Sequence, residues 1–192
     1  ISVPSTWKKI ARPEDLTLVD YATAVDVGDT SGTDRALLTK TEGDTEKLTV
    51  DFAAPVTGAM SIECDFRIEE PQPTAGLGSI KLFEINGISG TTNKDNLCGV
   101  TAGSLSEGGF YLRPVYKTSS LGNLGPMLNY KTWYHLKVVV DTETDTSSVY
   151  LGDTLIIGNV EFYAGAVADA IRQVRSFNNN TSVATNFMVD NL

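Results

Sequence analysis

Apolar and polar residues alternate with a period of two along most of the chain, which is the pattern of half-buried β-strands. In the segment 61–68 every second residue is apolar, and the positions between them hold serine or a charged residue. This pattern predicts an antiparallel strand with one face on the core. The segment 133–140 is largely apolar on both faces. It is therefore expected to be a central strand.

The same strand signal recurs in shorter segments separated by Gly, Asp and Asn turns. These segments are 16–25, 36–41, 47–52, 79–85, 97–102, 110–116, 147–151, 154–157, 171–177 and 186–189. A helix is expected only at 164–170, where alanine is frequent. Many short strands without intervening helices predict an all-β sandwich or jelly roll. A length of 192 residues suits one domain spanning 1–192.

Charge excludes several classes of partner. The chain has 15 Lys and Arg against 24 Asp and Glu, a formal net charge of −9. Nucleic acids and anionic membrane surfaces need a basic face, so neither is expected as a partner. An anionic polysaccharide is also disfavoured, although a local group of basic residues would override this global argument. Among polysaccharides, the net charge therefore favours a neutral or weakly polar one over an anionic one.

Two cysteines, Cys64 and Cys98, are too few for a disulfide scaffold and match no zinc-binding pattern. They either pair in an oxidising compartment or stay as buried thiols. The first residues show no basic stretch followed by an apolar core, so a signal peptide is expected to have been removed, or the chain to come from a longer protein.

Three segments carry a resemblance to a known family. The hairpin 132–156 contains TWYHLKVVVD followed by SVYLGDTLI, the segment 58–66 reads GAMSIECDF, and the chain ends in FMVDNL. These segments resemble, in the same order, strands of the concanavalin A-like, laminin-G-like jelly rolls of carbohydrate-active proteins. The resemblance implies a jelly-roll β-sandwich of two antiparallel sheets, secreted or at the cell surface, with polysaccharide or oligosaccharide as the partner.

Some enzymes of this fold carry an E-x-D-x-x-E motif on one strand, and the chain has Glu63, Asp65 and then Glu69. Arg67 interrupts the carboxylates and Glu69 comes too late for the motif. A solvated face with cross-strand charge pairs explains the same residues. A lyase would need a His or Tyr base beside basic residues. Its candidates are His135, the single histidine, with Arg113 and Tyr111, but the strand motifs of jelly-roll alginate lyases are absent.

Sugar binding needs aromatic surfaces for the apolar face of a pyranose ring and polar groups for its hydroxyls. In the segment 110–116, Tyr111 and Arg113 point away from their apolar neighbours, which gives such a mixed face. A role in covering the sheet edge would explain Tyr111 equally well. The full set of expected ligand-binding residues is Tyr111, Arg113, Tyr116, Lys117, Glu63, Asp65 and Arg67.

A structural calcium ion is common in jelly-roll modules, and the resemblance points to Asp190 as one ligand. Further carboxylates are plentiful in the early turns, at Asp26, Asp29, Asp34 and Asp44, and calcium takes six to eight oxygen ligands. Solvated turns explain these residues without an ion.

The sequence therefore favours a non-catalytic carbohydrate-binding domain, as a module of a polysaccharide-degrading protein. Two alternatives stay open. One is a small jelly-roll polysaccharide lyase or glycoside hydrolase that uses His135, Arg113 and Tyr111 or Glu63 and Asp65. The other is a structural or adhesive domain that packs against a neighbouring domain of a larger chain and binds no sugar.

Overall fold

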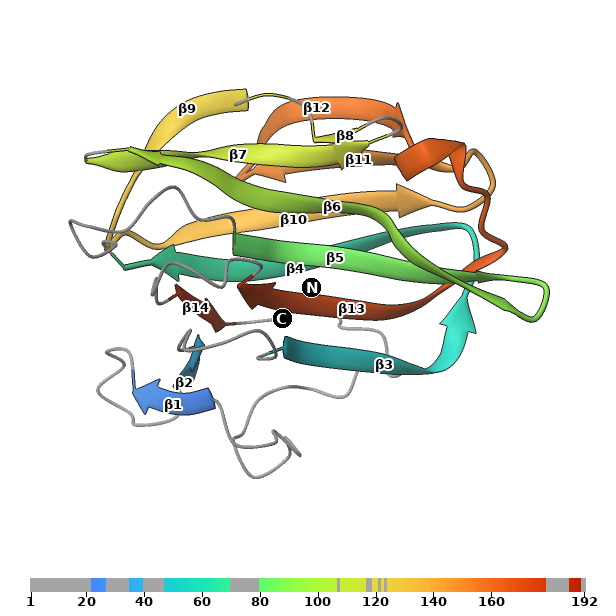
Figure 1. Ribbon diagram of the computed structural model, residues 1–192, viewed down its shortest axis with the longest axis horizontal. Helices are drawn as coiled ribbons and strands as arrows, with labels where there is room; N and C mark the ends of the chain where they lie inside the picture. Colours follow the sequence, from blue (N-terminus) through green and yellow to red (C-terminus); the bar gives the residue numbers. More distant parts are fainter. Residues whose placement is uncertain are drawn as a thin grey trace.

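Two antiparallel sheets stack face to face (Figure 1). The computed structural model describes residues 22–26, 35–39, 47–69, 80–106, 108–116, 119–120, 122, 124–178 and 187–190. Sheet A contains, in spatial order, β1 (Ala22–Asp26), β2 (Arg35–Thr39), β14 (Phe187–Asp190), β4 (Ala59–Ile68), β10 (Tyr134–Asp141), β11 (Thr146–Leu151) and β12 (Thr154–Glu161).

Sheet B contains β3 (Lys47–Val56), β13 (Ala170–Asn178), β5 (Ile80–Ser89), β6 (Thr92–Ser106), β7 (Gly109–Tyr116) and β8 (Ser119–Ser120), and β9 (Leu124–Asn129) also pairs with β7. The C-terminal strands β13 and β14 are inserted between earlier strands of the two sheets. This arrangement confirms the jelly-roll sandwich expected from the sequence. Within the described ranges, no helix has the length and apolar character that a membrane crossing requires.

The core lies between the inward faces of the two sheets. On β4 the side chains of Ile62, Cys64, Phe66 and Ile68 are fully buried, and the alternate side chains are partly or fully exposed. Phe66 meets Phe110 of sheet B edge to face, with 6.2 Å between ring centroids. Burial of each such aromatic side chain contributes about 2 to 3 kcal/mol. The alternation seen in the sequence therefore fixes which side chains point outward.

Strand β10 pairs with β4 on one side and β11 on the other, so the prediction of a central strand is confirmed. The prediction of a helix at 164–170 is wrong. The structure has one 3-10 turn at Tyr163–Gly165, and β13 begins at Ala170. Instead of a helical carbonyl, the backbone N–H of Ala168 donates to the Asp145 carboxylate at 3.0 Å. The Ala168 side chain is buried in the core. Tertiary contacts override the helix propensity of alanine here.

Both cysteines are buried and neither is part of a disulfide, so of the two alternatives left by the sequence the structure has buried thiols. Cys98 is fully buried on β6, in the core. Burial raises the pKa of the Cys98 thiol from 9.0 to about 12, because the thiolate would lose its hydration, and a hydrogen bond with Ser147 only partly opposes this.

The raised pKa of Cys98 predicts a loss of stability in alkali. The buried neutral thiol stabilises the fold fully below pH 9.0, the unfolded value, and this contribution disappears as the pH rises toward about 12. The full loss is about 4 kcal/mol. Urea unfolding of the protein and of Cys98→Ala across this range should show the difference between them shrinking as pH rises. A difference that stays constant with pH would contradict the prediction.

Candidate functional site

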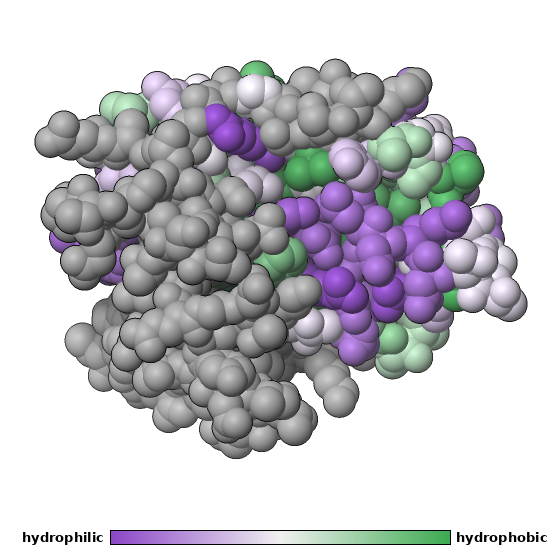
Figure 2. Space-filling model, in the orientation of Figure 1, coloured by the Kyte–Doolittle hydropathy of each residue, from purple (hydrophilic) through white to green (hydrophobic). Residues whose placement is uncertain are grey.

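Polar side chains gather on the outer face of sheet B, over β13, β5 and β3. Paired residues on neighbouring strands point to the same face of a sheet. Gln173 of β13 pairs with Asn86 of β5 and Asp51 of β3, and one step along the strands Arg175 pairs with Glu84. Figure 2 shows a hydrophilic patch over these strands. We call the linked group the sheet-B network, which consists of Asp51, Lys81, Glu84, Asn86, Asp95, Asn96, Arg172, Gln173 and Arg175.

The carboxamide of Gln173 joins three strands. Its Nε2 donates to Asp51 Oδ1 at 2.6 Å, and its Oε1 accepts from Asn86 Nδ2 at 2.9 Å and from Arg175 Nε at 2.6 Å. Asn86 is fully buried, and its Oδ1 accepts the Asn96 backbone N–H at 2.6 Å. These bonds hold both amides in one orientation, because a flipped amide would place donor against donor.

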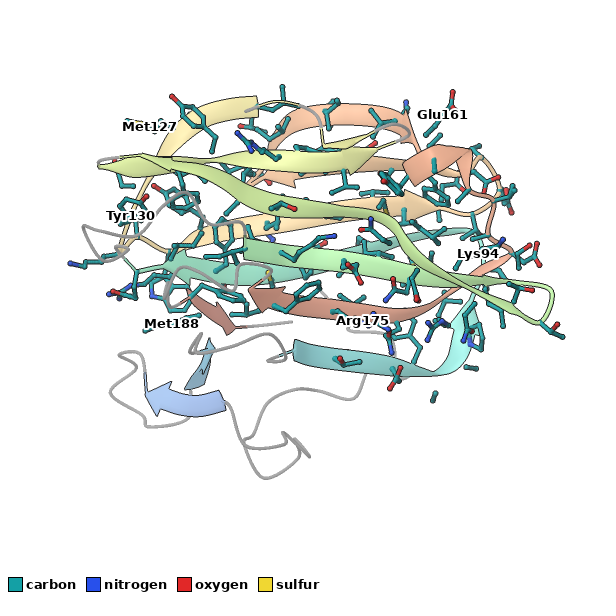
Figure 3. All side chains as sticks on the ribbon, in the orientation of Figure 1. Lys94, Met127, Tyr130, Glu161, Arg175 and Met188 are labelled. Carbon is teal, nitrogen blue, oxygen red and sulfur yellow. The ribbon has the colours of Figure 1, made fainter. Side chains whose placement is uncertain are left out.

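Glu84 lies between two cations. Its Oε2 is 3.0 Å from Lys81 Nζ and its Oε1 is 3.4 Å from Arg175 Nη1, and the Glu84 side chain is only 9% exposed. Lys81 Nζ also donates to Asn96 Oδ1 at 2.9 Å and lies over the Phe177 ring, 5.9 Å from its centroid. Figure 3 shows Arg175 on β13, beside the side chains of β5 and β3.

A second ion pair lies at the rim of the sheet-B network. Arg172 Nη2 is 2.8 Å from Asp95 Oδ1, and Arg172 Nε donates to the Gly87 carbonyl at 3.2 Å. The Asp95 side chain is 61% exposed, in contrast to the inner carboxylate of Glu84. Arg175 Nη2 is 4.0 Å from the same Asp95 oxygen, so both ion-paired groups belong to one continuous polar surface.

Tyr111 and Arg113 lie on the same outer face, on β7. Their neighbours Phe110 and Leu112 are buried in the core, which confirms the predicted division of this strand into two faces. Arg113 extends across β6 and covers Gly103, whose missing Cβ leaves room for the guanidinium group. Strand β7 is three strands away from β13, a separation of about 14 Å at normal strand spacing.

Glu63, Asp65 and His135 meet on the outer face of sheet A. His135 Nδ1 is 2.8 Å from Asp65 Oδ1, and His135 Nε2 is 3.4 Å from Glu63 Oε2. Lys137 adds a weaker contact with Glu63 at 3.7 Å. Arg67, on the same strand face, forms its ion pair with Glu69 at 2.8 Å. The contacts of Glu63 and Asp65 with His135 and Lys137 are cross-strand charge pairs, as one of the two interpretations of the sequence expected.

The residues expected from the sequence thus fall on two faces. Glu63, Asp65, Arg67 and His135 lie on the outer face of sheet A, and Tyr111 and Arg113 lie on that of sheet B. The alternative catalytic group of His135, Arg113 and Tyr111 is therefore separated by the whole sandwich, whose sheets stand about 10 Å apart. Lys117 and the side chain of Tyr116 lie outside the described residues.

The residues of the sheet-B network were missed by sequence analysis. The signal that was available is a polar residue inside an otherwise apolar strand, as at Glu84 and Asn86 of β5. On β13 a bulge between Ile171 and Gln173 breaks the alternation, so Arg172, Gln173 and Arg175 do not follow one simple period. Only the pairing of β13 with β5 and β3, which are far apart in sequence, brings them together.

Asp190, the expected calcium ligand, closes β14 and pairs in register with Asp65. Its side chain and those of Asp26, Asp29, Asp34 and Asp44 lie outside the described residues. Among the side chains that are described, no group of three or more His, Cys, Asp or Glu residues is arranged to hold a metal ion. The calcium site stays a prediction.

No family model and no curated protein matches this chain. Solved structures do match it. An alginate lyase of polysaccharide lyase family 7 superposes with a TM-score of 0.59 at 14% identity, over 90% of this chain and 81% of the lyase. The carbohydrate recognition domain of Emp46p, in a potassium-bound form, gives 0.50 at 14% identity, over 88% of this chain and 87% of that one.

A sialidase gives a TM-score of 0.53 at 13% identity over 90% of this chain, which spans only 16% of the sialidase. At these identities the likeness shows the fold. The chain has the concanavalin A-like jelly-roll fold that its sequence motifs suggested.

Asn86 provides a test of the sheet-B network. Asn86→Ala leaves the partly buried Asn96 backbone N–H without its acceptor and removes one donor to Gln173, so the free energy of unfolding should fall by about 1 to 3 kcal/mol. Asp95→Asn removes only a rim ion pair and should cost less than about 1 kcal/mol. Chemical denaturation of both variants measures these changes. Equal costs at the two positions would show that the network is an ordinary exposed surface.

Proposed function

We propose that the protein is a non-catalytic carbohydrate-binding domain that holds a polysaccharide on the outer face of sheet B. The observation that carries this proposal is the sheet-B network, in which buried amides and partly buried charged side chains hold one another in fixed orientations on the outer face of sheet B, with Asp95 exposed at its rim. Sugar hydroxyls need such oriented donors and acceptors, and strands place them more firmly than loops do. On the same outer face, Tyr111 and Arg113 of β7 would supply planar groups against which a sugar ring can stack.

The structural neighbours agree with a sugar ligand. By name they include alginate lyases, one of them in complex with its substrate, and a carbohydrate recognition domain. This chain shares their fold. The carbohydrate ligands named for these neighbours therefore support the proposal of a carbohydrate ligand here. A protein with such a ligand is expected to be secreted or at the cell surface, attached to a polysaccharide-degrading protein.

Binding is favoured over catalysis because the ionisable side chains of sheet B are either engaged in ion pairs or far from one another. A general acid or base must lie within hydrogen-bond reach of the proton that it transfers. Both oxygens of Glu84 are engaged by cations, and Tyr111 lies about 14 Å from β13. The single histidine of the chain, His135, is on the other sheet.

A second candidate is a small glycan-degrading enzyme whose site lies on sheet A. The observation that favours it is His135, whose ring is held between Asp65 and Glu63. A histidine oriented by a carboxylate is a common general base. Arg67 is close by but is already paired with Glu69.

Two kinds of experiment distinguish the two candidate functions. Affinity electrophoresis through gels that each contain one polysaccharide of a panel measures binding, and reducing-end and unsaturation assays on the same polymers measure turnover. We expect retardation without turnover. Gln173→Ala should weaken the retardation about tenfold, because it removes the group that orients Asn86 and Arg175. Arg113→Ala should weaken it less.

His135→Ala and Glu63→Gln serve as matched controls on sheet A, and both should bind as the unmodified protein does. Turnover that is lost in these two variants would favour the enzyme. A protein that is neither retarded nor active on any polymer would be the structural or adhesive domain. A thermal melt of each variant separates lost binding from lost folding.

We also propose a structural calcium ion with Asp190 among its ligands, as the family resemblance implies. An ion that binds only the folded state raises the melting temperature by mass action. The midpoint should therefore fall when a chelator is added and recover with excess Ca²⁺, and Asp190→Asn should respond weakly to both. An identical midpoint with and without chelator would make Asp190 an ordinary surface carboxylate.

A further inference from the structure

Every cation of the sheet-B network has a carboxylate of the same network at ion-pair distance. Lys81 and Arg175 share Glu84, at 3.0 and 3.4 Å, and Arg172 contacts Asp95 at 2.8 Å. The network holds three cationic and three anionic side chains, the third carboxylate being Asp51, which accepts from Gln173. The sheet-B network is therefore rich in charged groups and has no net charge.

This pairing decides what the face can recognise. A glycan carboxylate would have to displace Glu84 or Asp95 from its cation, and it would then stand next to the displaced carboxylate. Glu84 is poorly placed to move away, because its side chain is 9% exposed and is held from two strands. Like charges brought together in a partly desolvated site repel strongly.

The net charge of the whole chain also disfavours an anionic glycan. At −9 the protein repels a polyanion at long range, and only a local excess of cations would reverse that effect. The sheet-B network supplies no such excess. Hydroxyl groups, in contrast, need only donors and acceptors. The ion pair of Arg172 and Asp95 offers both, because the guanidinium donates and the carboxylate accepts.

We propose that Glu84 and Asp95 are specificity-determining residues: by neutralising Lys81, Arg175 and Arg172 they exclude polyuronates and reserve the sheet-B face for uncharged glycans. This inference rests on the proposed binding function. The proposed preference for uncharged glycans would distinguish this protein from its structural neighbours that are named as alginate lyases.

The experiment compares the binding of a neutral polyglucan and of polygalacturonate, each immobilised on beads, at low and at physiological ionic strength. The unmodified protein should bind the neutral polymer with little dependence on salt and should not bind polygalacturonate. Asp95→Asn releases Arg172 at an exposed position, so the variant is expected to fold. It should gain binding to polygalacturonate of about fivefold over background, and salt should remove this gain.

Glu84→Gln releases two cations and should gain more, provided that its thermal melt shows a folded protein. Asp153→Asn is the matched control, since it changes the net charge by the same amount in an exposed turn away from the network. It should leave both polymers bound as before.

The outcomes separate this inference from the function on which it rests. Binding of polygalacturonate by the unmodified protein, or no gain in Asp95→Asn beyond that of Asp153→Asn, overturns the specificity assignment and leaves carbohydrate binding intact. An unmodified protein that binds neither this pair of polymers nor any other polysaccharide overturns both. Neutral binding together with a salt-sensitive gain in Asp95→Asn supports both.

Discussion

Burial of alternate side chains between the two sheets is the constraint on which the rest of the structure depends. Phe66 of sheet A and Phe110 of sheet B meet between the two sheets, and a shift of one residue in either strand would turn its ring to solvent. The register of β4 and β7 is therefore set by the core. Once it is set, the outward residues are set as well, including Asp65 on one face and Tyr111 on the other.

This dependence explains which features of the fold could be predicted from the sequence. Alternation identified β4 and β10 and separated the inward Phe110 from the outward Tyr111, because a strand's two faces follow from its own residues. It did not give the order of strands in space. Tyr111 and His135 therefore looked like possible partners in one site, although they lie on opposite outer faces.

The same limit hid the sheet-B network. Asp51, Glu84 and Gln173 come from three strands that neither the local pattern nor the family motifs connect. The bulge at Arg172 further disturbs the period of β13, so its polar residues do not stand out. The helix expected at 164–170 failed for a related reason, since Ala168 is buried against other elements and its backbone bonds to Asp145. In each case a long-range contact outweighs a local preference.

The composition of the sheet-B network also bears on what it is for. Buried polar groups cost free energy unless all their partners are present, and apolar residues of similar size would stabilise a sheet at least as well. Gln173 and Asn86 satisfy each other at that cost, on a face where the fold does not require them. The network therefore holds many donors and acceptors in fixed orientations on the outer face of sheet B. Under the proposed carbohydrate-binding function this cost has a use, because groups that are already oriented lose little entropy when a ligand with many hydroxyls binds.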